Sequence, residues 1–128
     1  MGLSSTACAG EDFWYATQRV KTVAFGDLVR LPLVTYYEDA FRKATGVSLK
    51  LAPPEEPKKF LAVGKCANPF CTLVSRTPVG NAACLEAGVL AHRAVASRRV
   101  TYQSHCFAGM TIVAMPVMIG GQHVATLL

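Results

Sequence analysis

The final stretch of the chain, GMTIVAMPVMIGGQHVATLL, constrains the fold more than any other segment. An apolar run over residues 110–119 is followed by Gly120-Gly121 and then by a second apolar run. Two glycines between two such runs predict a β-hairpin, because a two-residue turn needs positive φ angles that glycine adopts without strain. Odd- and even-numbered residues of the first run are both apolar, so we expect a central strand that is covered on both faces. Pro116 has no backbone N–H to donate, so we expect it at a bulge or at a position where the strand needs no donor. The chain ends inside the second run, which predicts an edge strand truncated at Leu128.

Helices and a strand precede this hairpin. Apolar residues on one helical face predict a helix over residues 33–46, ended by Gly46 in the left-handed conformation. Residues 47–51, VSLKL, alternate in polarity and predict a half-buried strand. Residues 53–59, PPEEPKK, carry three prolines and four charges, which predict an exposed loop.

Two further helices are expected in the middle of the chain. Pro69 opens a short one, PFCTLVSR, and Thr77-Pro78 starts a longer one, because threonine caps a helix and proline costs nothing at its first position. On the longer helix we expect His92 near the exposed side and small residues toward a sheet. The inward residues are Cys84, Gly88, Ala91 and Val95.

Next, VTYQSHC predicts a strand that leads into the hairpin. The order of elements is helix, strand, helices and then antiparallel strands, which indicates an α+β fold with one sheet and segregated helices. We expect residues 1–26 to form a partly helical N-terminal extension around Phe13, Trp14 and Tyr15, and residues 27–128 to form the domain.

Composition excludes several classes of protein. The chain of 128 residues is 52% hydrophobic and 16% charged, so it is not disordered. Its net charge of +5 is spread without a dense basic run, so we expect no direct contact with DNA. The longest apolar run is shorter than the ~20 residues of a membrane span. Five cysteines without a signal-peptide pattern indicate a reducing, cytoplasmic location.

The cysteines leave two interpretations open. Cys66 and Cys71 have C-x4-C spacing, and Cys84 and Cys106 follow, with His105 as a possible substitute ligand. The spacing is loose for a structural zinc site, and thiols are commonly buried as small apolar groups. We therefore expect no metal and no cofactor; if a metal is bound, Cys71, Cys84 and Cys106 are its candidate ligands.

Catalysis is not expected. His105 and Cys106 are adjacent, so in a strand their side chains leave on opposite faces and do not pair. The chain has no phosphate-binding loop, zinc-protease motif or nucleophile elbow. What remains is a pocket of apolar and sulfur-containing side chains, against the simpler alternative of a filled core. The candidate ligand-binding residues are Phe70, Cys71, Cys84, Tyr102, Cys106, Phe107, Met110 and Met115.

Three stretches in order, NPFCTLVSRTPVGNAACL, YQSHCFAGM and AMPVMIGGQHVATLL, resemble the sensory domain of the PocR family. The resemblance covers about residues 33–128. It implies a PAS-like antiparallel sheet with helices packed on one face, and the sensing of small organic molecules that are simple hydrocarbon derivatives. Two positions depart from the family pattern: Phe107 stands where many members have His, and Met110 replaces the usual Leu.

The expectation that follows is a cytoplasmic ligand-sensing domain of a bacterial transcription regulator. The family implies attachment to an AraC-type DNA-binding domain, so DNA would be contacted only through a domain absent from this chain. An incomplete sheet edge favours a homodimer. The alternatives are the sensor domain of a histidine kinase, a metal- or redox-responsive cysteine module, and a purely structural dimerisation domain with a filled core.

Overall fold

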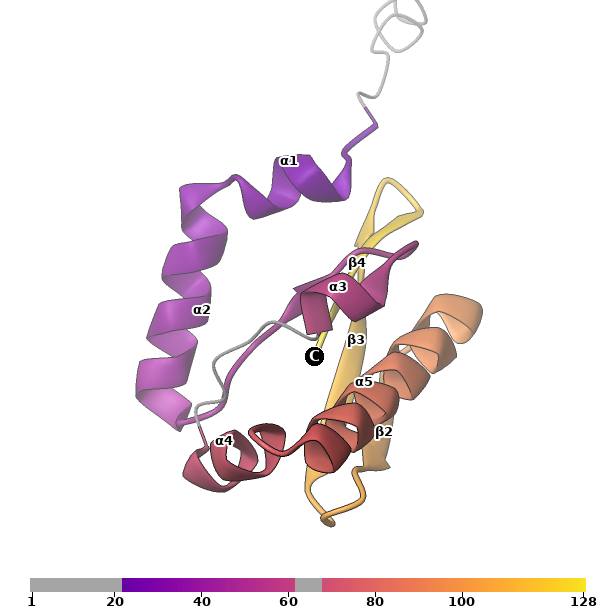
Figure 1. Cartoon of the computed structure of the whole chain (residues 1–128). Helices are drawn as coiled ribbons and strands as arrows, with labels where there is room; N and C mark the ends of the chain where they lie inside the picture. The colour runs from indigo at the N-terminus through magenta and orange to yellow at the C-terminus, as the bar shows by residue number, and fades with distance from the viewer. Residues whose placement is uncertain (1–21, 62–67) are drawn as a thin grey trace, which may run out of the picture.

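The computed structural model describes residues 22–61 and 68–128 (Figure 1). The expected helix around Phe13, Trp14 and Tyr15 lies outside the described residues, as does Cys66. In chain order the elements are α1 (Phe25–Val29), α2 (Pro32–Thr45), β1 (Leu51–Ala52), α3 (Pro57–Leu61), α4 (Pro69–Ser75), α5 (Pro78–Arg98), β2 (Tyr102–His105), β3 (Thr111–Ile119) and β4 (Gln122–Leu127).

The strands form one antiparallel sheet in the order β1-β4-β3-β2. The long helix α5 packs across β2, β3 and β4, while α2 stands at the side of the domain (Figure 1). The α+β prediction is confirmed. The last strand, β4, is interior, between β1 and β3, and the edges of the described sheet are β1 and β2.

The core lies between α5 and the sheet. Ala91 and Val95 of α5 and Ala114 of β3 are fully buried, and these small side chains let the helix approach the strands closely. This confirms the predicted inward position of Ala91 and Val95, whereas Gly88 faces Leu61 of α3. By contrast, the predicted exposure of His92 is wrong, because only 2% of the residue is exposed. The helix turns that side toward the segment after β1, a contact that α5 alone does not reveal.

The hairpin prediction is confirmed in its turn and wrong in its burial. Gly120 and Gly121 both have positive φ, 57° and 78°, and the ladder shifts register between Val117 and Met118, directly after Pro116. However, the described residues cover β3 on one face only, since Val113 remains 41% exposed. The apolar residues at both odd and even positions of β3 therefore did not predict burial on both faces of the strand.

A tight corner joins α4 to α5. Asn68 caps α4 by accepting a hydrogen bond from the Phe70 N–H at 2.8 Å, and Thr77 caps α5 through the Gly80 N–H at 3.0 Å. A Cβ at Gly80 would lie 2.3 Å from the Val74 carbonyl oxygen, so only glycine fits there. Both helix starts were predicted correctly, α4 from Pro69 and α5 from the Thr77-Pro78 pair, while the Asn68 cap was not predicted.

The segment that connects α2 to α3 differs from expectation. Gly46 ends α2 at φ 72° as predicted, but the strand is only Leu51–Ala52, extended by paired backbone hydrogen bonds between Lys50 and Leu128 at 2.7 and 2.8 Å. The predicted exposed loop is also wrong in part: Pro53 is buried, and α3 begins at Pro57. Proline fits the first turn of a helix, so this proline starts a helix rather than preventing one.

Candidate functional site

Two histidines from distant parts of the chain meet between α5 and the sheet. The rings of His92 and His123 are stacked with centroids 6.3 Å apart and planes inclined by 30°. The Nε2 atom of His92 lies 3.1 Å from the carbonyl oxygen of Pro54. Because a carbonyl only accepts, Nε2 donates this hydrogen bond and carries a proton. The buried Nδ1 atom of the same ring has no hydrogen-bond partner among the described residues.

His123, the other member of this pair, is a residue of β4. Its Nε2 lies 3.1 Å from the Thr126 hydroxyl. Burial lowers the pKa of His123, and the nearby charges of His92 and Arg99 lower it further, while a backbone hydrogen bond at Ala125 and the Glu55 carboxylate act in the opposite direction. The environment thus favours the neutral ring of His123.

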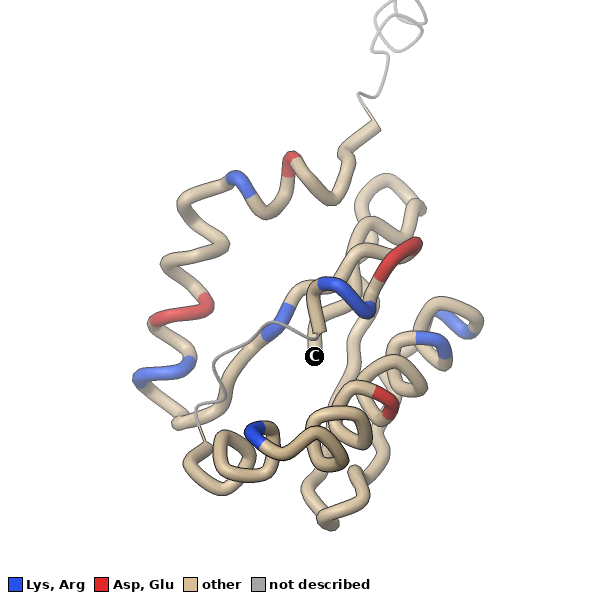
Figure 2. Tube along the Cα trace, in the orientation of Figure 1, with Lys and Arg blue, Asp and Glu red and all other residues tan. Residues whose placement is uncertain are grey.

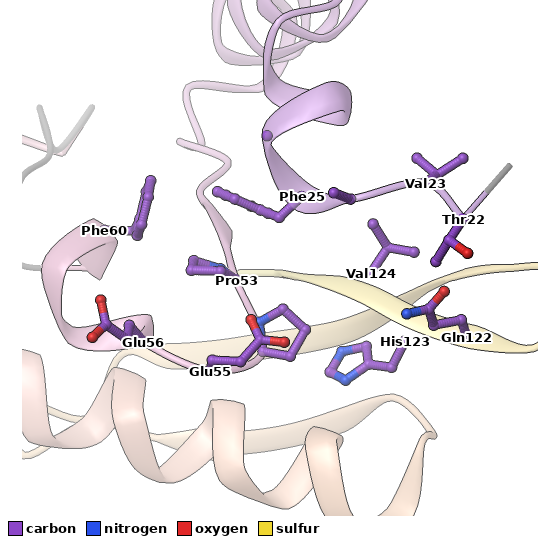
Figure 3. A pocket seen from close by; sticks show the side chains of 13 residues that line it. Thr22, Val23, Phe25, Pro53, Glu55, Glu56, Phe60, Gln122, His123 and Val124 are labelled. Atoms are coloured by element: carbon purple, nitrogen blue, oxygen red, sulfur yellow. The ribbon is translucent and has the colours of Figure 1, made fainter.

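A cavity of about 480 Å³, here called cavity 1, opens beside His123. Figure 3 shows it between α1, the segment after β1, α3 and the start of β4. Phe25 and Phe60 form an apolar wall, with ring centroids 4.9 Å apart in an edge-to-face arrangement. The remaining lining residues are Thr22, Val23, Ala24, Gly26, Pro53, Pro54, Glu55, Glu56, Gln122, His123 and Val124.

A second cavity of about 590 Å³, cavity 2, lies on the α5 side of the same loop. Residues 54–56 line both cavities, so this loop is their common wall. His92 lines cavity 2 and His123 lines cavity 1. The other lining residues of cavity 2 are Pro57, Lys58, Lys59, Val89, Arg93, Ala96 and Ser97.

None of the eight residues predicted to bind ligand lines cavity 1 or cavity 2. The structure does not bring them to one place either. Tyr102 packs against the core under α5, whereas Met115 follows the buried Ala114 and lies on the other face of the sheet. Phe70 and Cys71 are on α4, Cys84 is on α5, and Cys106, Phe107 and Met110 form the turn between β2 and β3.

The turn between β2 and β3 has a structural explanation. The Cys106 N–H donates to the Met110 carbonyl at 2.8 Å, and the Gly109 N–H donates to the Cys106 carbonyl at 2.9 Å. Gly109 has φ 77°, which favours glycine, and Phe107 is 58% exposed. His105, the last residue of β2, is exposed, and Cys106, the first residue after it, is half-buried. The Cys-Phe-Ala-Gly-Met stretch therefore closes a hairpin.

The described residues contain no group of three or more His, Cys, Asp or Glu side chains that could hold a metal ion. Cys71, Cys84 and Cys106 are each half-buried in that part of the chain. Likewise, no described helix is long and apolar enough to cross a bilayer.

Residues 27–128 match the family described as "Sensory domain found in PocR". The chain belongs to this PocR sensory-domain family. No match was found among curated proteins or among solved structures. The family assignment makes this a sensory domain, and it agrees with the resemblance read from the three sequence stretches.

Sequence reasoning missed the histidine pair and the two cavities of this PocR-family domain. The contact between His92 and Pro54 joins residues 38 positions apart, and His123 reaches the pair from the last strand. No spacing rule links these segments. The one available signal was a histidine on the helix that packs against the sheet, which helical periodicity assigned to the wrong side.

Proposed function

We propose that this sensory domain binds a small organic metabolite in cavity 1 and passes the signal to an attached output domain. The observation that carries the proposal is the composition of the cavity wall. Phe25, Phe60 and Val124 supply apolar surface, and Gln122 and His123 supply polar groups at one end (Figure 3). Sites for small molecules typically combine these features.

The position of cavity 1 also suits a sensor. Its walls come from α1, α3 and β4, which are far apart in sequence and otherwise make few contacts with one another. A ligand that bridges them would bind one arrangement of these elements better than another, and that difference in affinity is what shifts a conformational equilibrium. The proposed output is an AraC-type DNA-binding domain of a bacterial regulator, by analogy with the family.

The proposal includes a cytoplasmic homodimer without catalytic activity. An odd number of cysteines without a signal-peptide pattern supports the location. The edge position of β2 supports self-association, since only one of its sides is paired within the described sheet.

A thermal-shift screen with short-chain alcohols, aldehydes, amines and carboxylic acids tests the site. Phe60 and Phe107 make a matched pair for this purpose, because both are exposed aromatic residues, at 42% and 58%, and only Phe60 lines cavity 1. Phe60→Ala should abolish the stabilisation by an active compound, and Phe107→Ala should preserve it. The reverse result would move the ligand to the turn between β2 and β3, where the predicted residues Cys106, Phe107 and Met110 lie.

A further inference from the structure

Helix α2 exposes an apolar stripe on one of its faces. The members of the stripe recur at helical spacing and are Leu33, Tyr36, Tyr37, Ala40 and Ala44. Leu33 is 71% exposed, Tyr36 is 73% exposed and Tyr37 is 56% exposed. No residue of α2 is buried, and α1 is the only described element with which α2 makes an extended contact (Figure 1). The stripe is therefore free to contact another molecule.

The exposed apolar face is not explained by packing within the chain. An amphipathic helix gains most of its stability in a protein by packing its apolar face, and large exposed apolar patches commonly mark interaction surfaces. The ring of Tyr37 is also held in position, because it stacks on Phe41 with centroids 6.2 Å apart and planes inclined by 30°. An oriented, exposed aromatic ring is suited to a contact between proteins.

The charge of α2 allows a second copy of the chain to approach. The whole chain carries a net charge of +5, but α2 contains two acidic and two basic residues and is neutral. Asp39 forms ion pairs with Arg42 and with Lys43, the latter at 2.7 Å. Figure 2 shows that the charged positions of α2 lie in its middle and toward its C-terminal end. Two copies can therefore meet along α2 without repulsion between like net charges.

The sizes of the stripe residues favour one orientation of two such helices. The large side chains, Leu33, Tyr36 and Tyr37, lie in the N-terminal half of α2, and the small Ala40 and Ala44 lie in the C-terminal half. In an antiparallel pair the large side chains of one helix face the small side chains of the other. A parallel pair would place large against large and leave a gap between the alanines, which close packing disfavours. The stripe is thus complementary to itself about a two-fold axis.

The area of the stripe is sufficient for a weak homodimer. Aromatic side chains bury about 150–250 Å² each in protein contacts. With Leu33 and the alanines added, the two stripes of an antiparallel pair would remove roughly 1,000 Å² from water, which is at the lower end of the range for specific interfaces.

From these features we infer that the stripe of α2 is the contact surface of a homodimer in which the two α2 helices lie antiparallel. Tyr37 lies opposite Ala40 of the partner subunit, and Leu33 lies opposite Ala44 of the partner subunit. The inference rests on the homodimer included in the proposed function, and it assigns the contact to α2 instead of the edge of β2.

Sedimentation equilibrium of the parent chain and of two variants tests the contact. Tyr37→Lys and Ala40→Glu each place a charge in the apolar contact, and the two-fold axis repeats the change in both halves of the interface. Each variant should raise the dissociation constant of the dimer at least about tenfold. Thr35→Lys is the matched control, because Thr35 is exposed on the side of α2 opposite the stripe and should leave the dimer unchanged.

An equimolar mixture of Tyr37→Lys and Ala40→Glu tests the orientation. In an antiparallel mixed dimer the new lysine of one chain faces the new glutamate of the other, and the second half of the interface keeps the parent pair of Tyr37 and Ala40. The mixture should therefore dimerise more tightly than either variant alone. A parallel pair would not bring the two new charges opposite each other, so no recovery would follow.

Each contrary result has a different meaning. A dimeric parent that neither variant weakens would overturn the contact through α2 and leave the proposed homodimer standing on another surface, such as the edge of β2. Weakened variants without recovery in the mixture would overturn the antiparallel arrangement. A parent that remains monomeric would overturn both the contact and the homodimer, and the Phe60 experiment would still decide on ligand binding in cavity 1.

Discussion

The two ends of this domain differ in how their residues are used. At one end, the α4–α5 corner and the turn between β2 and β3 carry the recognisable sequence stretches, and there Asn68, Gly80 and Gly109 set backbone geometry. At the other end, the loop after β1 meets α5 and β4, and His92 and His123 converge without any motif. The comparison teaches that recognisable stretches can mark positions that the fold requires, while chemically useful groups gather elsewhere.

The largest expected effect at the corner is on stability. Gly80→Ala should lower the free energy of unfolding by about 3 kcal/mol, because the new Cβ would collide with the Val74 carbonyl 2.3 Å away. Gly88→Ala is the matched control on the same helix. Its Cβ would make ordinary contact with Leu61 at 3.4 Å, so stability should hold or rise by up to about 1 kcal/mol. Urea unfolding of both variants measures the difference, and equal losses would contradict the explanation.

A smaller loss is expected at the turn between β2 and β3. Gly109 has φ 77°, a conformation in which an L-residue costs about 1–2 kcal/mol. Gly109→Ala should lose about that much stability in urea unfolding. Gly26→Ala provides a comparison, because its Cβ would meet no atom within 4 Å and its φ is not positive. If Gly109→Ala were as stable as the parent, the turn would not explain why glycine stands there.

The cap of α4 should contribute less again. Asn68→Ala removes the acceptor for the Phe70 N–H and should cost about 1 kcal/mol. Asn68→Asp keeps an acceptor oxygen and should retain most of the stability. Thermal unfolding with ligand-binding measurements separates the two roles: the cap variant should lose stability and keep ligand affinity. A loss of affinity at constant stability would assign Asn68 to a binding site.

The smallest expected effect lies at the histidine pair and concerns pH. Burial lowers the pKa of His123 below its ordinary value of 6.5. In the interval between the two pKa values the unfolded chain therefore binds more protons, so stability falls as the pH drops below about 6.5 and levels off below the folded pKa. His123→Gln should flatten this part of the profile. Unfolding measured across this range would contradict the account if parent and variant had the same slope. Glu38 has the opposite effect on stability, at lower pH. Burial raises its pKa above 4.5, so the folded chain binds more protons there and stability falls as the pH rises.

Local sequence signals predicted local structure well in this chain. The helix starts at Pro69 and Thr77-Pro78, the left-handed end at Gly46 and the Gly120-Gly121 turn depend on a few neighbouring residues, and each is confirmed. The burial of His92 depends on the proline segment after β1, which a helical wheel does not contain. Whether a face of β3 is buried depends on which element packs against it, and the apolar composition of the strand does not predict that element.

The predicted site residues show the same limit. Phe70, Cys71 and Phe107 were predicted as apolar or sulfur-containing side chains of a pocket, and the structure places them on α4 and on a turn. Cavity 1 combines residues from positions 22–26, 53–60 and 122–124, and its existence depends on tertiary contacts between them. Whether the eight predicted residues bind ligand stays a prediction that the next measurement compares with cavity 1.

The most direct test maps ligand contacts onto backbone amide signals. A compound that stabilises the domain in the thermal-shift screen is titrated into ¹⁵N-labelled protein, and amide shifts are compared between the two ends of the domain. We expect the largest shifts at Glu55, Phe60 and Val124, with little change at Cys71 and from Cys106 to Met110. Largest shifts in the turn between β2 and β3, with none around cavity 1, would contradict the central claim.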